Sequence, residues 1–180
     1  ILHQINTNLL GSINVIRAAL PHLRMQGGGR IIQVSTYGGQ AALPGGALYH
    51  TTKWGIEGFC DTLAQELAPF KIGVTIVEPG GARTEFRFGS SKLAAPMEAY
   101  NGTPAGMVHT FIKDTSRLPI GDPSRMVKLM IDSVDQNPAP KRLVLGSDSF
   151  KAMQKALSDR LAAVETQKDL AFSTDFPGSG

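Results

Sequence analysis

The sequence contains few of the residues on which several classes of protein depend. Its single cysteine, Cys60, excludes an internal disulfide, and a small buried apolar residue is its simplest interpretation. No apolar run approaches the ~20 residues that span a bilayer, and no stretch has the pattern of a signal peptide. We therefore expect a protein of the cytoplasm without a membrane partner, and we assign it no metal site.

Charge is low and evenly spread. The 180 residues include 18 Lys and Arg against 15 Asp and Glu, a formal net charge of +3, and only 7% are aromatic. The basic residues are scattered, whereas a nucleic-acid-binding surface gathers them into a patch or stripe. A basic module for nucleic acid or a membrane surface is supported only by the pI of about 9.1, and we expect neither partner.

One stretch in the first third of the chain combines a strand, a glycine-rich loop and a helix. The short β-branched run of residues 30–34 predicts a buried strand. Ser35 and Thr36 follow at its carboxyl end, where open α/β sheets place their ligands. The helix after the loop carries Tyr49 and Lys53 four residues apart, so both side chains lie on one face.

A phenol, an ammonium and a hydroxyl at one point form a site for proton transfer. A free tyrosine has a pKa of ~10 and is a poor base at neutral pH, but a nearby cation lowers that value. Lys53 is placed to act on Tyr49 in this way, and a hydroxyl can hold the substrate oxygen for general acid–base transfer. On the residues alone, a solvated helix face with the same spacing remains an alternative.

With its surroundings, this pattern resembles the short-chain dehydrogenase/reductase family. Thr36 stands thirteen residues before the Tyr49-x-x-x-Lys53 pair, where the family usually has serine. Three further stretches agree in order and spacing: Asn8-Leu-Leu-Gly11, Pro79-Gly-Gly-Ala-Arg-Thr84 and Gly146-Ser-Asp148. The resemblance implies an α/β fold with a Rossmann-like, doubly wound parallel sheet. This chain would hold its C-terminal portion, about three strands with flanking helices.

The resemblance also implies an activity, the transfer of hydride between NAD or NADP and a carbonyl or alcohol substrate. Tyr49 would be the general acid/base, Thr36 would orient the substrate, and Asn8 would complete a proton relay to Lys53 through a water. The residues implied for cofactor binding are Tyr49, Lys53, Pro79, Gly80, Gly81 and Thr84. Those implied for substrate binding are Ser35, Thr36, Tyr37 and Tyr49.

The strand end departs from the family pattern at two positions. Thr36 keeps the hydroxyl of the usual serine but adds a methyl group and stiffens χ1. Ser35 would point to the other side if the strand continues, so we prefer Thr36 for the substrate oxygen. Tyr37 replaces a residue that is commonly small, and either lines the substrate pocket or lies on the surface.

The glycine-rich turn with which the family binds phosphate does not occur in this sequence. Residues 27–29 are glycines, but they precede a strand, which is the wrong context for binding phosphate. The first half of the fold should precede Asn8 and occupy roughly 100 residues. We therefore expect residues 1–180 to be one domain, the C-terminal part of a longer protein. The alternative is an inactive fragment that acts only as an oligomerisation or structural unit.

The remaining expectations concern elements and partners. NADP is slightly preferred over NAD, and the resemblance implies a homodimer or homotetramer through helices 1–25 and 49–69. A bend or break is expected at Pro21. Residues 85–121 are read as an irregular substrate lid, and residues 151–180 as an amphipathic helix with a loosely ordered tail. Further strands are expected at 73–77 and 142–145, and a further helix at 124–134.

Overall fold

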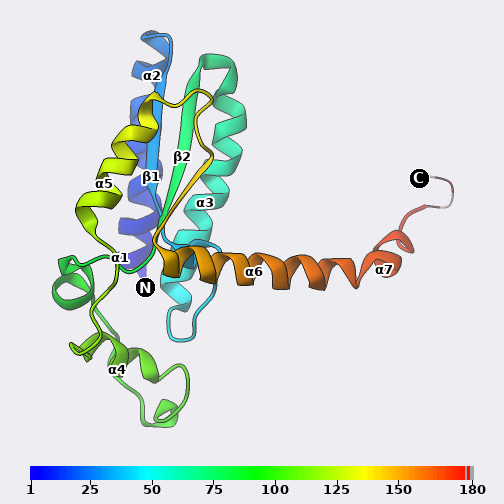
Figure 1. Cartoon of the computed structure of the whole chain (residues 1–180). Coiled ribbons are helices and arrows are strands. Elements are labelled where there is room, and N and C mark those ends of the chain that lie inside the picture. The colour runs from blue at the N-terminus through cyan, green and yellow to red at the C-terminus, as the bar shows by residue number, and fades with distance from the viewer. Residues whose placement is uncertain (177, 179–180) are drawn as a thin grey trace.

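The computed structural model describes residues 1–176 and 178, and within them the expected parallel α/β sheet is confirmed (Figure 1). The sheet has three strands in the order β1 (Gly29–Val34), β2 (Ile72–Pro79) and β3 (Arg142–Leu145), all parallel. The helices are α1 (Leu2–Ile5), α2 (Gly11–Met25), α3 (Ala47–Leu67), α4 (Met107–Lys113), α5 (Pro123–Asp132), α6 (Ser147–Glu165) and α7 (Lys168–Phe172).

The central strand β2 builds a core on each face of the sheet. Because side chains alternate along a strand, Val74 and Ile76 face one side and Val77 faces the other. The first face packs against α2 and α3, in a cluster with Ile16, Ile31, Ile56, Cys60, Leu63, Leu67 and Ile72. The second face packs against α5, in a cluster that contains Met126 and Leu145. The sheet is thus covered on both faces, as its apolar strands predict.

The N-terminal helix runs past the proline that was expected to interrupt it. It consists of α1, a π-helical turn at Asn6–Leu10 and α2, and α2 continues through Pro21 to Met25. Of the expected bend or break at Pro21, the break is therefore wrong. A proline removes one backbone hydrogen bond and its ring crowds the carbonyl four residues earlier, and near the end of a long, packed helix this cost is tolerated.

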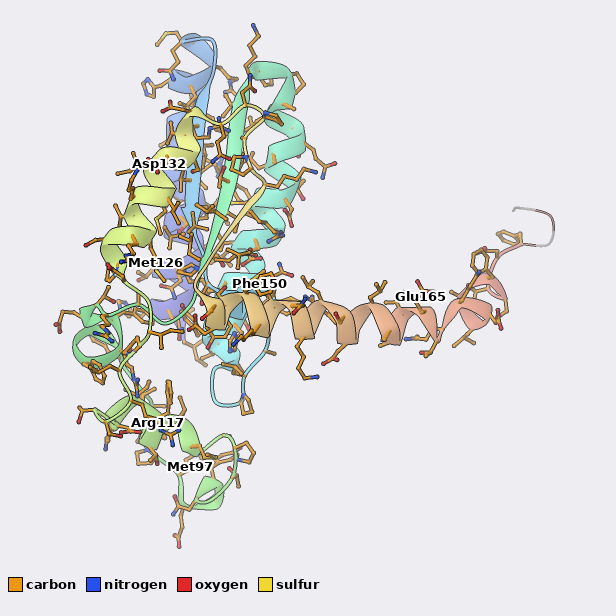
Figure 2. The ribbon with its side chains drawn as sticks, viewed as in Figure 1. Met97, Arg117, Met126, Asp132, Phe150 and Glu165 are labelled. Carbon is orange, nitrogen blue, oxygen red and sulfur yellow. The ribbon has the colours of Figure 1, made fainter. Side chains whose placement is uncertain are left out.

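The segment expected to be an irregular lid is folded more closely than its sequence predicts. It leaves the sheet after Ala82 and returns at Gly121, where the two residues form a parallel β-bridge. Arg87 holds its interior together, because its guanidinium donates to the carbonyls of Arg117 (2.6 Å) and Asp114 (2.9 Å), and also to that of Phe111. Figure 2 labels Met97 and Arg117 in this segment, which lies beyond the carboxyl ends of the strands.

Helix α6 begins after β3 and extends away from the sheet (Figures 1 and 2). Of its expected apolar stripe, Met153 is buried, whereas Leu157, Leu161 and Val164 are 47%, 62% and 66% exposed because the helix continues past the body it packs on. No helix in the described part of the chain is both long and apolar enough to cross a membrane. Residues 177, 179 and 180 of the expected tail lie outside the described residues.

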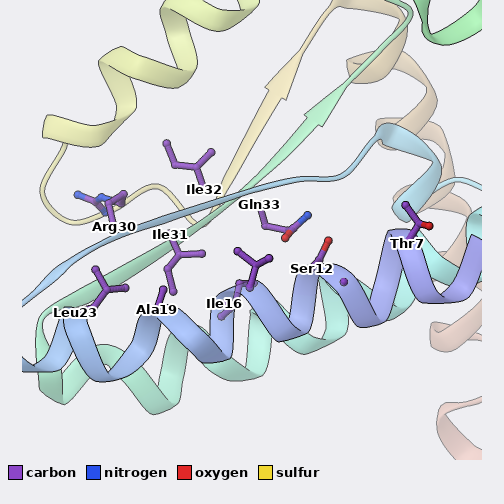
Figure 3. A pocket seen from close by; sticks show the side chains of 11 residues that line it. Thr7, Ser12, Ile16, Ala19, Leu23, Arg30, Ile31, Ile32 and Gln33 are labelled. Carbon is purple, nitrogen blue, oxygen red and sulfur yellow. The ribbon is translucent and has the colours of Figure 1, made fainter. Parts of the chain in front are cut away.

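A mostly apolar groove of ≈ 500 Å³ lies between α2 and β1 (Figure 3). It follows the edge of β1 that does not pair with β2. Its lining consists of Thr7, Gly11, Ser12, Val15, Ile16, Ala19, Leu23, Arg30, Ile31, Ile32 and Gln33. None of the residues expected to bind substrate or cofactor is among them.

A buried ion cluster joins α3, β2 and β3. Arg142 Nη1 lies 2.8 Å from Glu57 Oε2 and 2.7 Å from Glu78 Oε1, and Nη2 lies 2.5 Å from Asp61 Oδ2. The side chains of Glu57 and Glu78 are 2% and 0% exposed. Burial, and then repulsion by Glu57, raise the pKa of Glu78 to about 7, with Arg142 acting in the opposite direction.

The raised pKa of Glu78 predicts a pH-dependent stability. The folded protein keeps a proton that the unfolded chain loses near its ordinary pKa of 4.5, so stability falls as pH rises from that value to about 7. The free energy of unfolding, measured with urea, should differ less between about pH 5 and about pH 8 in Glu78→Gln than in the wild type. We expect the difference to shrink by about 1–3 kcal/mol. Glu66→Gln, at an exposed position of α3, is the control. An unchanged pH dependence in Glu78→Gln would contradict the assignment.

Candidate active site

Helix α3 brings Tyr49 and Lys53 to the carboxyl end of β1, as their spacing predicts. The Lys53 ammonium donates to the carbonyl of Val34 at 3.2 Å, the last residue of the strand. Its Nζ lies 5.9 Å from the centroid of the Tyr49 ring. Both side chains are partly buried, so the phenol and the ammonium share one half-desolvated region at the edge of the sheet.

The electrostatics of this pair differ from the sequence expectation. Burial raises the pKa of Tyr49, and a hydrogen bond with the Thr36 side chain acts against that rise. Burial lowers the pKa of Lys53, while the charge of Glu57 acts against that fall. The expected lowering of the Tyr49 pKa by Lys53 is therefore not the net effect, because desolvation of the phenol dominates. A raised pKa favours the protonated form of Tyr49, which can donate a proton.

The structure separates the roles of the two hydroxyls at the end of β1. The Thr36 hydroxyl lies with Tyr49, donates to the carbonyl of Pro79 at 3.4 Å and accepts from the backbone N–H of Gly38 at 3.4 Å. The Ser35 hydroxyl donates inward, to Glu57 Oε1 at 2.5 Å, and Ser35 is only 3% exposed. Thr36 thus joins the group around Tyr49, and Ser35 lies apart from it.

Asn8 lies beside α3 on the π-helical turn of the N-terminal helix. Its side-chain amide donates to the Thr52 hydroxyl at 3.4 Å, and that hydroxyl donates to the backbone carbonyl of Tyr49 at 2.8 Å. Asn8 therefore reaches the backbone of the first turn of α3. Its expected relay to Lys53 through a water stays a prediction.

His50 organises the loop before α3, and the sequence analysis did not identify it. Its Nδ1 donates to the carbonyl of Gly38 at 2.6 Å and its Nε2 accepts from the N–H of Leu43 at 3.2 Å, a pattern that needs the neutral Nδ1–H tautomer. A Cβ at Gly38 or at Gly46 would lie 2.7 Å or 2.8 Å from atoms of the ring. The two glycines are the sequence signal that could have indicated this ring.

The expected cofactor loop, residues 79–84, is fixed by the segment that follows β3. The N–H of Gly80 donates to the carbonyl of Leu145 at 2.8 Å, and the N–H of Gly81 donates to Asp148 Oδ2 at 2.8 Å. A Cβ at Gly80 would lie 2.0 Å from Asp148 Oδ1. Thr84, at the end of the loop, is exposed.

The segment expected to be a lid lies against both α3 and the loop that precedes α3. The ring of Phe86 lies 6.1 Å from that of Tyr49, at an interplanar angle of 43°. A Cβ at Gly45 would lie 2.9 Å from the carbonyl oxygen of Ala105, so the lid backbone packs closely on this loop. Tyr37 is partly buried near Tyr49 and Asp148, and burial together with Asp148 raises its pKa. Aromatic rings thus border the region around the Tyr49 phenol.

Similarity to known proteins covers both the sequence and the fold. Residues 1–92 match the sequence model of the family described as short chain dehydrogenase. Oxidoreductase BOA17 of Botryotinia fuckeliana is 33% identical over 171 residues, 95% of this chain and 62% of that protein. A crystal structure of a short-chain dehydrogenase from Streptomyces avermitilis shares 31% identity at a TM-score of 0.82, over 94% of this chain and 60% of that one.

A more distant solved structure shares the fold. It is a short-chain dehydrogenase from Burkholderia cenocepacia in complex with NADP, with 21% identity and a TM-score of 0.58. The match covers 88% of this chain and 55% of the Burkholderia chain. The chain therefore spans 62%, 60% and 55% of the lengths of these three relatives.

The space around Gly80 and Gly58 predicts opposite effects on the free energy of unfolding when each is replaced by alanine. Gly80→Ala forces the loop and the carboxylate apart, so we expect it to lower the free energy of unfolding by about 1–3 kcal/mol. At Gly58, an exposed position in α3, a Cβ meets nothing within 4 Å. Gly58→Ala should therefore raise that free energy by about 0.5–1 kcal/mol. Urea unfolding measures both, and equal effects would refute the packing described for Gly80.

Proposed function

The chain belongs to the short chain dehydrogenase family, and on this basis we propose that the complete protein is an oxidoreductase whose Tyr49 exchanges a proton with a carbonyl or alcohol oxygen. One observation supports this most strongly. The Tyr49 phenol, held protonated by burial, lies with the Thr36 hydroxyl at the carboxyl end of the sheet. Two hydroxyl groups at this position can hold the same substrate oxygen.

A nicotinamide cofactor would accept or supply the hydride of this reaction. The residues of this chain fit the nicotinamide end of such a cofactor. Lys53 offers an ammonium that can bind ribose hydroxyls, and the glycine backbone after β2 allows close approach. Asp148 Oδ1 is buried beside that backbone without a hydrogen-bond partner among the described residues, so an acceptor remains there. We propose that Tyr49, Lys53, residues 79–81 and Thr84 hold the cofactor, with NADP slightly preferred over NAD.

The roles of the side chains follow from their protonation and contacts. In the direction of reduction, Tyr49 donates its phenolic proton to the carbonyl oxygen as negative charge develops there. Thr36 orients the same oxygen through its hydroxyl. Lys53 stabilises the phenolate left on Tyr49, because a cation within a few ångströms favours the charged form. Asn8 and Thr52 fix the first turn of α3, which carries the phenol.

The lid supports an apolar carbonyl or alcohol as the small-molecule substrate. Large apolar side chains in this segment remain accessible, with Phe86 59%, Met107 64% and Phe111 57% exposed. Tyr37 adds a further ring beside Tyr49. A homodimer or homotetramer and a place in the cytoplasm stay predictions for this protein.

Replacement of the proposed acid/base tests this function. In the complete protein, Tyr49→Phe should lower kcat at least about 10²-fold, the lower end of what general acid–base catalysis contributes, because the phenolic proton is lost. The Kd for NADPH should change far less than kcat, by about threefold at most, because Lys53 and the loop after β2 still hold the cofactor when the single Tyr49 hydroxyl is lost. Tyr100→Phe, at a half-exposed position of the lid, is the matched control. A near-normal kcat in Tyr49→Phe would contradict the assignment, and a wild type that binds no nicotinamide would favour the alternative of a structural unit.

The two hydroxyls at the end of β1 give a second test. Thr36→Ala should lower kcat/KM about tenfold or more relative to Ser35→Ala, because only the Thr36 hydroxyl lies with Tyr49. Ser35→Ala should mainly destabilise the fold, since it removes a buried hydrogen bond to Glu57. Parallel kinetics and urea unfolding measure both effects. The reverse ranking in kcat/KM would move the substrate-orienting role to Ser35.

A further inference from the structure

Glu57 continues the row that Tyr49 and Lys53 begin on α3. It follows Lys53 by four residues, so the three side chains lie on one helix face in successive turns. Unlike the other two, its carboxylate is almost entirely withdrawn from solvent, with 2% of the side chain exposed. A buried carboxylate is strongly unfavourable unless it is hydrogen-bonded and paired with a cation, so its partners indicate what it is for.

Two of those partners are the two ends of the loop that carries Thr36. Ser35 precedes Thr36 and donates to Glu57 Oε1 at 2.5 Å. Gln40 closes the short helical turn Tyr37–Gly39 and donates from its side-chain amide to Glu57 Oε2. One carboxylate therefore binds both ends of a segment whose middle holds the Thr36 hydroxyl.

The loop backbone also lies directly on this carboxylate. A Cβ at Gly39 would lie 1.8 Å from Glu57 Oε1, so only glycine fits there. The third partner, Arg142 Nη1 at 2.8 Å from Oε2, comes from β3 and compensates the charge. The hydrogen bonds of Glu57 with Ser35 and Gln40 thus lead to the loop, and its ion pair leads to Arg142 on β3.

A second layer attaches the loop to α6. The guanidinium of Arg160 donates to the backbone carbonyl of Gln40 at 2.9 Å and to its side-chain oxygen at 3.0 Å. The same guanidinium lies 4.8 Å from the centroid of the Trp54 ring on α3. Gln40 therefore sits between a buried anion and a surface cation, with its amide oriented by both.

We propose that Glu57 is a positioning residue that fixes the segment from Ser35 to Gln40 and thereby holds the Thr36 hydroxyl against Tyr49. The negative charge of the Glu57 carboxylate strengthens these hydrogen bonds, and the length of its side chain lets it contact both Ser35 and Gln40. A glutamine at position 57 removes the negative charge that strengthens the hydrogen bonds from Gln40 and Arg142. It also presents an amide N–H on one side, so that the Ser35 hydroxyl has to accept where it now donates. The consequence for turnover rests on the proposed function, whereas the ordering of the loop does not.

Hydrogen exchange of the complete protein tests the ordering of the loop without any substrate. Three loop amides bond within the turn, those of Gly39 to Thr36 and of Gln40 and Ala41 to Tyr37. In Glu57→Gln we expect their exchange to quicken about tenfold or more, while the amides of β2 and α5 keep their rates. Glu66→Gln, exposed on the same helix, should leave all of them unchanged. Unchanged loop exchange, or a rise shared equally by β2 and α5, would overturn the proposal.

A second variant keeps the test decisive if Glu57→Gln does not fold. Gln40→Leu removes one end of the loop from Glu57 but leaves the pairing of Glu57 with Arg142 in place. It should quicken the exchange of the same loop amides by about the same factor, again without change in β2 or α5. Loop amides that exchange at the wild-type rate in Gln40→Leu would overturn the proposal.

A kinetic measurement separates positioning from general stability. If the proposed function holds, Glu57→Gln should lower kcat about tenfold while the Kd for NADPH changes by no more than about twofold, because the cofactor loop after β2 does not contact Glu57 and Lys53 keeps its place on α3. A parallel loss of NADPH affinity would show a merely structural effect and contradict the proposal. A wild type without turnover would refute the proposed function alone, since the exchange result stands by itself.

Discussion

The ion pair between Glu57 and Arg142 is the interaction on which the site depends. It joins α3, the helix that carries Tyr49, to β3, and it compensates the charge of Glu57, whose side chain is buried. Through Arg142 it also includes Glu78, the residue of β2 directly before the cofactor loop. Through Glu57 it includes the loop that carries Thr36. The elements around Tyr49 are therefore positioned by one charged cluster beneath them.

Above that cluster, the parallel sheet determines which residues can meet. Because β1, β2 and β3 run in the same direction, the loops after all three emerge at one edge. There the Thr36 hydroxyl reaches the carbonyl of Pro79, and Asp148 reaches the backbone of Gly81. Ring contact between Phe86 and Tyr49 adds the lid to the same place. The parallel direction of the strands, and the loops that follow them, thus decide which side chains lie together around Tyr49.

The sequence predicts what depends on local periodicity and spacing. Its short apolar runs indicate the three strands, and the four-residue spacing places Tyr49 and Lys53 on one face of α3. It does not predict contacts between distant positions, such as Glu57 with Ser35 and Arg142, 22 and 85 residues away. The net shift of the Tyr49 pKa is missed for a similar reason, because it depends on burial by the whole fold.

Cofactor binding is the most direct test of the nicotinamide-dependent site proposed around Tyr49 and Lys53. Calorimetric titration of NADPH and NADH into the complete gene product, wild type and Lys53→Met, is the measurement. We expect saturable binding of about one nucleotide per chain with a Kd in the micromolar range, weakened about tenfold or more in Lys53→Met. A folded wild-type protein that binds neither nucleotide, or a Lys53→Met variant that binds as tightly as the wild type, would contradict it.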